Sequence, residues 1–227
     1  MPSPAEWEVV LLSLRVALLA LVASLPFAIA AAYVLARKSF PGKSLFDAVV
    51  HLPLVLPPVV VGFALLVLFG REGPIGRLLE PLGIVLAFRW TGAALAAAIM
   101  GFPLLVRAIR LSIEAVDPRL EVAARTLGAS RTAVFFTVTL PLAASGVATG
   151  ALLAFARSLG EFGATITFVS NIPGETQTLP LAIYTATQVP NGDAAAWRLS
   201  ILSVLLSLAA LTISEAMARR RALGRHD

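Results

Sequence analysis

The chain has 227 residues, 58% of them hydrophobic and 14% charged, whereas a soluble domain carries about 25% charged residues. The low charge indicates that much of the surface faces lipid, and the length leaves little room for a separate soluble domain. There is no cysteine and there are only two histidines, which excludes disulfides, thiolate metal sites and a histidine metal cluster.

Five apolar segments follow one another along the chain, and a membrane-spanning helix needs about 20 mostly apolar residues. They cover approximately residues 9–36, 46–69, 91–106 with an extension toward 113, 134–156 and 197–217. The N-terminal residues lack the positive charge of a cleavable signal peptide, so the first segment is expected to be retained. The sequence therefore predicts an all-helical integral membrane protein with about five transmembrane helices. We expect a single domain over residues 1–227, with its core at about 9–217.

The positively charged residues predict the orientation of these helices. Twelve of the 18 Lys and Arg residues lie in residues 37–43, 107–131 and 219–225, whereas 71–89 and 157–198 hold only five. Because Lys and Arg accumulate in cytoplasmic loops, this alternation predicts an outside N-terminus and a cytoplasmic C-terminus. Topology thereby explains the net charge of +5, and a nucleic-acid partner is not expected.

The predicted outer ends of the segments carry interfacial residues. Trp7, Trp90 and Trp197 all fall at these ends, where aromatic side chains anchor helices at the membrane surface. Arg15 lies within about two turns of the outer end of the first segment, so its side chain can extend to the interface. A role for Arg15 in an ion pathway is the alternative.

Prolines interrupt the second apolar segment at Pro53, Pro57 and Pro58. Each proline removes a backbone donor and kinks a helix, and the freed carbonyl groups then need other partners. One interpretation is a kink that serves packing, and the other is a broken helix that lines a translocation path. Gly62 has the same two interpretations, because glycine allows either close helix packing or a pivot.

The predicted cytoplasmic loop at residues 117–130 has the local features of a short helix with its own caps. Asp117 is a good N-cap, and Gly128 can adopt the left-handed conformation that ends a helix. Glu121 and Arg125 have the i,i+4 spacing of a helical ion pair. These residues predict a short helix between the third and fourth segments.

One face of this short helix is apolar and is formed by Leu120, Ala123, Ala124 and Leu127. A helix of about ten residues is marginally stable alone, so it is expected to pack against something. Small alanines favour close docking into a groove of another protein. The alternative is an amphipathic helix that lies on the membrane surface.

The loop and the segment after it carry an alanine pair, a glycine and a Leu-Pro pair at the spacing of the EAA motif of type I ABC importer permeases. This spacing resembles the motif at Ala123, Ala124, Gly128, Val138, Leu140 and Pro141. Two departures are Glu121, which stands one position earlier than the usual Glu, and Val138 in place of Ile. The resemblance implies a coupling helix at 117–130 that sits in a cleft of a cytoplasmic ATPase. The residues implied in this contact are Glu121, Ala123, Ala124, Gly128, Leu140 and Pro141.

Four further stretches, at residues 40–43, 51–62, 157–164 and 168–176, resemble the permease subunits for molybdate uptake, over about 11–215 in all. Sulfate and tungstate permeases are close relatives and are the alternatives for the substrate. The resemblance implies a homodimer in the bacterial cytoplasmic membrane, with a translocation path at the dimer interface. It also implies two ATPase subunits below and an extracytoplasmic molybdate-binding protein above.

No ATP site is expected in this chain. Gly42-Lys43-Ser44 resembles the end of a phosphate-binding loop, but Arg37 stands where that motif needs its first glycine. ATP and Mg are therefore expected on a separate ATPase, and no catalytic residue, metal site or cofactor is expected here. A secondary transporter without an ATPase would need coupling-ion sites or acidic residues within the spans, and the sequence offers none.

The stretch after the fourth segment contains polar residues that could meet a passing anion. Ser158, Thr165 and Thr167 are candidates to line the path, together with the prolines and glycine of the second segment. Glu161 would repel an oxyanion, so we expect a structural role, in a pair with Arg157 or in a contact with the binding protein. No cluster of cations is predicted at mid-membrane depth, so the path is expected to bind weakly.

Overall fold

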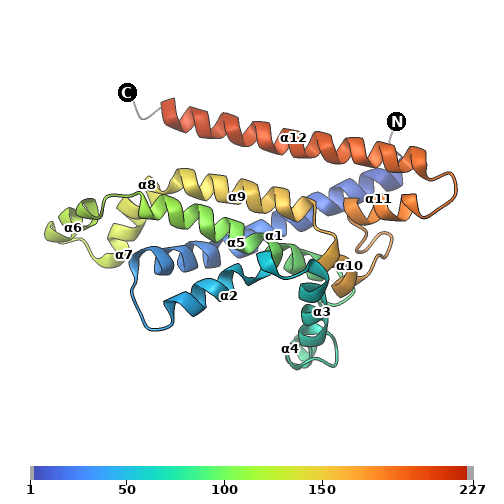
Figure 1. The fold of residues 1–227 in the computed structure, drawn as a ribbon, viewed down its shortest axis with the longest axis horizontal. Helices are drawn as coiled ribbons and strands as arrows, with labels where there is room; N and C mark the ends of the chain where they lie inside the picture. The colour runs from blue at the N-terminus through green and yellow to red at the C-terminus, as the bar shows by residue number, and fades with distance from the viewer. Residues whose placement is uncertain (1–2, 224–227) are drawn as a thin grey trace.

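The computed structural model describes residues 3–223, without the side chains of residues 210, 211 and 213–223. The described chain is helical throughout and contains no strand (Figure 1). Its elements are α1 (Pro4–Arg37), α2 (Lys43–Val55), α3 (Pro58–Phe69), α4 (Pro74–Leu79), the 3-10 turn η1 (Glu80–Leu82), α5 (Trp90–Glu114), α6 (Pro118–Thr126), α7 (Arg131–Val134), the π-helical segment η2 (Phe135–Thr139), α8 (Leu140–Leu142), α9 (Ala144–Leu159), α10 (Gly163–Val169), α11 (Leu179–Thr187) and α12 (Asp193–Leu223).

Helices α1, α5 and α9 form the centre of the bundle, with α5 packed against both of the others. Small residues make the contact, and Ala20, Ala28 and Ala32 of α1 and Ala93 and Ala97 of α5 are fully buried. Because lipid supplies no hydrophobic force between helices, small side chains that let backbones approach closely are what hold such a bundle together. The predicted all-helical class is confirmed.

Two helices, α1 and α5, are individually long and apolar enough to cross a membrane. By the same measure, up to four spans result among the described residues if each of two sharply bent pairs of helical segments is one span. The fifth predicted segment lies within α12, but most of its side chains and the basic residues at 219–225 lie outside the description.

The second predicted segment is two helices, because α2 and α3 meet at an angle of 112°. The break falls at Pro57, since Leu56 is extended and Pro58 occupies the first turn of α3. Pro53 lies within α2 and does not end it. In Figure 1, α3 and α4 project away from α1, α5 and α9. The structure thus favours the broken helix over a mild packing kink.

The fourth predicted segment is also broken, which corrects the expectation of one helix over 134–156. The chain bends by 68° at Ala143, between the part ending with α8 and the long helix α9. Phe135–Thr139 is π-helical, and Pro141 follows in α8. A proline removes a backbone hydrogen bond, and π-helical turns commonly mark such irregular stretches.

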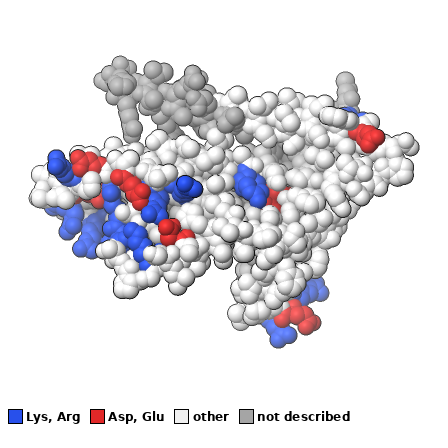
Figure 2. All heavy atoms as spheres, in the orientation of Figure 1, with Lys and Arg blue, Asp and Glu red and all other residues white. Residues whose placement is uncertain are grey.

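Charged side chains gather at the end of the bundle that carries α6 and α7 and at the tip of the α3–α4 arm, and only a few others appear on the rest of the face in view (Figure 2). The first of these regions brings together Arg37, Lys38, Arg125 and Arg131, from the two internal connections predicted to be cytoplasmic. At the other end of α5, the guanidinium carbon of Arg15 lies 3.7 Å from the centre of the Trp90 ring. This stacking agrees with an interfacial position for Arg15.

Candidate docking loop and translocation path

The loop between α5 and α7 folds as the capped helix that its sequence predicts. The Asp117 carboxylate accepts a hydrogen bond from the Arg119 N–H at 2.9 Å, which caps the start of α6. Gly128 follows the helix with a φ of 92°, and the Ala129 N–H closes the turn on the Ala124 carbonyl at 3.1 Å. The left-handed conformation explains the glycine, because any Cβ would be strained there.

The apolar face of α6 is largely uncovered within the described chain. No residue of α6 is buried, Ala123 is exposed, and the following Leu127 is 89% exposed. Apolar side chains displayed beside basic ones at one end of a molecule indicate a surface that another molecule covers. The helix is therefore available for docking.

Glu121 points back into its own chain. Its Oε1 accepts hydrogen bonds from Arg37 Nε and from Thr139 Oγ1, both at 3.0 Å, and its side chain is only 18% exposed. Arg37 also donates to the Val116 carbonyl at 2.8 Å. Glu121 therefore pairs with Arg37 and not with Arg125 as predicted. Water and salt screen the attraction between two largely buried charges less than that between two exposed ones, which favours the pair with Arg37.

This carboxylate ties three elements together. Arg37 is the last residue of α1, Glu121 lies in α6, and Thr139 ends η2. Leu140 and Pro141 follow Thr139 directly in α8, at the base of the loop. The two halves of the motif seen in the sequence are thus joined by the Glu121 side chain, while Ala123, Ala124 and Gly128 remain accessible.

Replacing Glu121 with alanine is expected to loosen the loop. The change leaves the largely buried Arg37 guanidinium without its carboxylate, a loss of about 1–3 kcal/mol for a hydrogen bond to a charged group. Trypsin should then cleave after Arg119 and Arg125 several-fold faster in membranes that expose the loop. Glu72→Ala is the control, because Glu72 is almost fully exposed and 3.9 Å from Arg77. An unchanged cleavage rate in Glu121→Ala would show that the carboxylate does not anchor the loop.

Helix α3, the second half of the broken segment, contacts α10 at two glycines, Gly62 and Gly163. A Cβ on Gly62 would lie 2.5 Å from the Ala164 carbonyl oxygen and 2.9 Å from Thr167 Cβ. A Cβ on Gly163 would lie 2.7 Å from Pro58 Cβ. Helices α3 and α10 therefore touch backbone to backbone, which favours the close-packing interpretation of Gly62.

The three predicted hydroxyl residues have different surroundings. Ser158 is buried and its Oγ lies 3.4 Å from the Ala97 carbonyl oxygen, and Thr165 is buried as well. Thr167 is partly exposed and donates to the Gly163 carbonyl at 2.8 Å. Pro57 is exposed at the break and Pro58 is partly exposed. The candidate path residues thus lie around the junction of α3, α9 and α10, with Ser158 and Thr165 inside the packing.

The predicted pair of Arg157 and Glu161 is confirmed. Arg157 Nη1 lies 2.6 Å from Glu161 Oε2, and the other carboxylate oxygen accepts the Ala164 N–H at 2.8 Å. Glu161 is 3% exposed, so it joins α9 to α10 from within the protein. The sequence placed Arg157 in an outer connection, whereas it lies in the last turn of α9.

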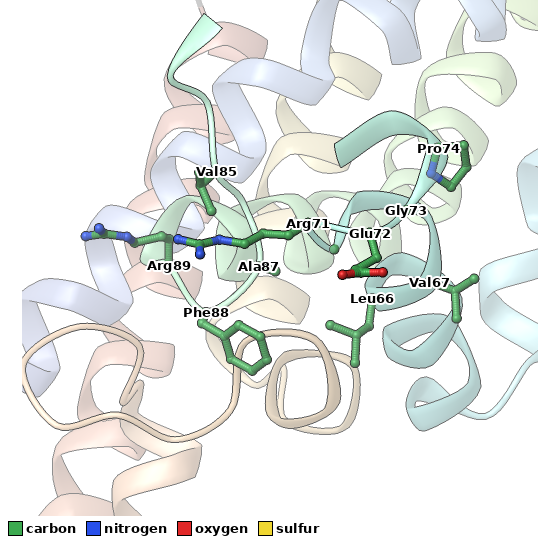
Figure 3. A pocket seen from close by; sticks show the side chains of 11 residues that line it. Leu66, Val67, Arg71, Glu72, Gly73, Pro74, Val85, Ala87, Phe88 and Arg89 are labelled. Atoms are coloured by element: carbon green, nitrogen blue, oxygen red, sulfur yellow. The ribbon is translucent and has the colours of Figure 1, made fainter. Parts of the chain in front are cut away.

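A pocket of about 840 Å³ opens beside the α3–α4 arm (Figure 3). It is lined by the end of α3, by the turn at residues 70–74 and by residues 85–89. Arg71 and Arg89 extend in the same direction in Figure 3, and Arg89 lies 3.6 Å from Glu175. These side chains give the pocket polar groups that can meet an anion or an acidic protein surface.

Comparisons with known proteins identify relatives over almost the whole chain. The family model of the binding-protein-dependent transport system inner membrane component matches residues 24–223. The chain is 63% identical over 215 residues to the molybdenum transport system permease protein ModB of Escherichia coli K12, covering 94% of both chains. It is 56% identical over 216 residues to ModB of Haemophilus influenzae, covering 95% of this chain and 94% of the relative.

Solved structures share the fold. A bacterial ABC transporter involved in the import of alginate superposes with a TM-score of 0.76 at 18% identity, covering 96% of this chain and 80% of that chain. The MetNI methionine ABC transporter in an inward-facing conformation gives a TM-score of 0.69 at 16% identity, covering 97% and 99%. The identity to the two ModB proteins confirms the predicted resemblance to molybdate permeases. The chain therefore belongs to the family of inner membrane components of binding-protein-dependent transport systems.

Proposed function

We propose that this chain is the permease subunit of an ATP-driven importer that moves molybdate across the bacterial cytoplasmic membrane. The observation that carries the proposal is the exposed apolar helix α6, held at the basic end of the bundle by Glu121. Relatives with up to 63% identity that are molybdenum permeases support the choice of substrate. ATP and Mg bind a separate ATPase chain, and this chain contributes the path.

The proposed arrangement in the membrane has five spans, an outside N-terminus and a cytoplasmic C-terminus. Helices α1 and α5 cross directly, and the two bent pairs and α12 supply the others. The basic residues around α6 support placing that end of the bundle in the cytoplasm. The Arg15–Trp90 stack then lies at the outer interface.

The proposed partners are a second copy of this chain, two ATPase subunits and an extracytoplasmic molybdate-binding protein. Exposed apolar residues of α3, including Val59, Phe63 and Val67, give the projecting arm a surface for the second copy. Helix α6 docks into the ATPase through Ala123, Ala124 and Gly128. The pocket beside Arg71 and Arg89 faces the binding protein. Closure of the ATPases moves α6 and switches the path from inward-facing to outward-facing.

Tungstate and sulfate are the competing substrates. A sulfate permease protein CysW of Synechococcus elongatus is 42% identical over 175 residues, covering 75% of this chain and 61% of the relative. The lower identity and coverage favour molybdate. An ATPase-independent secondary transporter is a second class of function, and the exposed docking helix argues against it.

Uptake of labelled oxyanions by the reconstituted complex tests the proposal. Proteoliposomes are prepared with the ATPase and ATP in the lumen and with the binding protein outside. They should accumulate molybdate in the lumen only when ATP is present there. An excess of unlabelled sulfate should compete weakly. Preferential sulfate uptake would overturn the substrate, and accumulation without ATP would overturn the ABC importer.

A further inference from the structure

Arg157 lies well inside the bundle. The neighbouring Ser158 Oγ lies 3.4 Å from the Ala97 carbonyl oxygen, so the last turn of α9 lies beside Ala97 of α5. Ala97 is seven residues from Trp90, the first residue of α5, which corresponds to about 10 Å along the helix axis. In Figure 1, α9 ends well short of the N-terminal end of the bundle, where α11 lies. Arg157 therefore lies at hydrocarbon depth if Trp90 marks the interface.

The surroundings of Arg157 leave most of its hydrogen-bonding groups unused. One nitrogen pairs with Glu161, and the side chain is 28% exposed. The other guanidinium N–H groups have no hydrogen-bond partner within the described part of the chain. A guanidinium with unpaired donors is strongly disfavoured in lipid. The exposed side of Arg157 is therefore unsuited to lipid, and its donors call for water, a polar solute or a polar group of another chain.

Two residues with hydroxyl groups precede Arg157 on α9. The exposed Leu153 lies one turn before Arg157, and the rotation of about 100° per residue in an α-helix places Thr149 and Ser145 about 80° and 120° from Arg157 around the axis. Both are exposed, and neither hydroxyl has a partner among the residues that the structure describes. Gly150 and Ala154, which pack against α5, lie nearer to Arg157 around the helix, at about 20° and 60°. Arg157 thus lies at the edge of the face that packs against α5, and the two hydroxyls lie on the adjoining exposed face.

We infer that Arg157 contacts the oxyanion as it passes through the membrane, and that Glu161 weakens this contact so that the anion leaves. A planar guanidinium donates two parallel hydrogen bonds to an oxyanion. A lone cation at this depth would hold a dianion too firmly, because transport requires binding that is readily reversed. The buried Glu161 carboxylate lowers the positive potential and keeps Arg157 in place. This inference depends on the proposed function only for the identity of the anion.

Uptake by three variants separates this role from a merely structural ion pair. Arg157→Gln is expected to lower uptake roughly tenfold, the loss of one hydrogen bond to a charged group. The double variant Arg157→Gln with Glu161→Gln removes both charges and should stay equally defective, whereas Arg157→Lys should retain part of the activity. All variants are compared at equal amounts of folded complex. Recovery of uptake in the double variant would overturn the inference, since a structural pair can be replaced by two neutral groups.

Thiol labelling tests the same position without any transport. The chain has no cysteine, so Arg157→Cys in a Glu161→Gln background carries a single thiol in a neutral site. A small anionic methanethiosulfonate should modify it in the assembled complex, and molybdate should slow the reaction. Leu18→Cys is the control, because Leu18 is an exposed residue of α1. Its neighbours Val16 and Ala20 share a core cluster with Ala97, so Leu18 lies at a similar level of the bundle.

The labelling outcomes distinguish the path from its substrate. A thiol at position 157 that is as unreactive as one at position 18 would overturn the inference. A reactive thiol protected by sulfate and not by molybdate would keep Arg157 in the path and would overturn the proposed substrate instead.

Discussion

Ala123→Trp is expected to abolish ATPase docking while the permease itself still folds. Ala123 is exposed on α6, and no residue of that helix is buried, so the indole meets nothing in its own chain. At the centre of an interface, a misfit that costs about 3 kcal/mol lowers affinity more than 100-fold. Co-purification of the ATPase with the permease, and molybdate uptake by cells, should both fall to background.

Ala194→Trp is the matched control for this experiment. Ala194 is also an exposed helical alanine, but it lies in the first turn of α12, at the opposite end of the bundle from α6. This variant should retain ATPase binding and uptake. If Ala123→Trp retained both as well, the assignment of α6 as the coupling helix would fail.

Gly62→Ala is expected to damage the junction between α3 and α10 although it adds a single carbon atom. The new Cβ would lie 2.5 Å from the Ala164 carbonyl oxygen, a backbone atom that cannot rotate away. Overpacking of this kind costs about 1–3 kcal/mol, and the helices must separate to relieve it. Because Ala164 is also bonded to Glu161, the shift would reach the Arg157 pair. We expect a lower unfolding temperature in detergent and a large loss of uptake.

Gly160→Ala makes the same chemical change two residues before Phe162, the residue that precedes α10. Its Cβ would meet only the Ala156 carbonyl oxygen at 3.9 Å, which is an ordinary contact. The unfolding temperature and uptake should therefore match those of the unchanged protein. Equal behaviour of Gly62→Ala and Gly160→Ala would show that the close contact of α3 with α10 is not needed.

The features that the sequence predicted correctly depend on neighbours in the chain. Asp117 and Gly128 cap α6 through bonds within the same few residues, and Arg157 pairs with Glu161 one turn away. Such local geometry follows from residue type and spacing alone. The break at Pro57 was open to two interpretations for the same reason, because prolines locate a bend without giving its angle.

The features that the sequence missed depend on residues far apart in the chain. Arg37 lies 84 positions from Glu121, so the sequence suggested the nearer Arg125 as its partner. The depth of Arg157 depends on how α9 is staggered against α5, which the contacts of Ser158 with Ala97 and of Ala154 with Gly101 reveal. The contact of Gly62 with Ala164 likewise joins two segments about 100 residues apart. Helical periodicity carries no information on these tertiary relations.

The Glu121 bond gives the loop a mechanical connection to the far side of the protein. Arg37, which it holds, ends a single helix of 34 residues, about 50 Å long at 1.5 Å per residue. In the first turn of that helix, Glu6 is held in turn by Arg198 at 2.9 Å. Helix α6 and the start of α12 are therefore bonded to opposite ends of one continuous helix, α1.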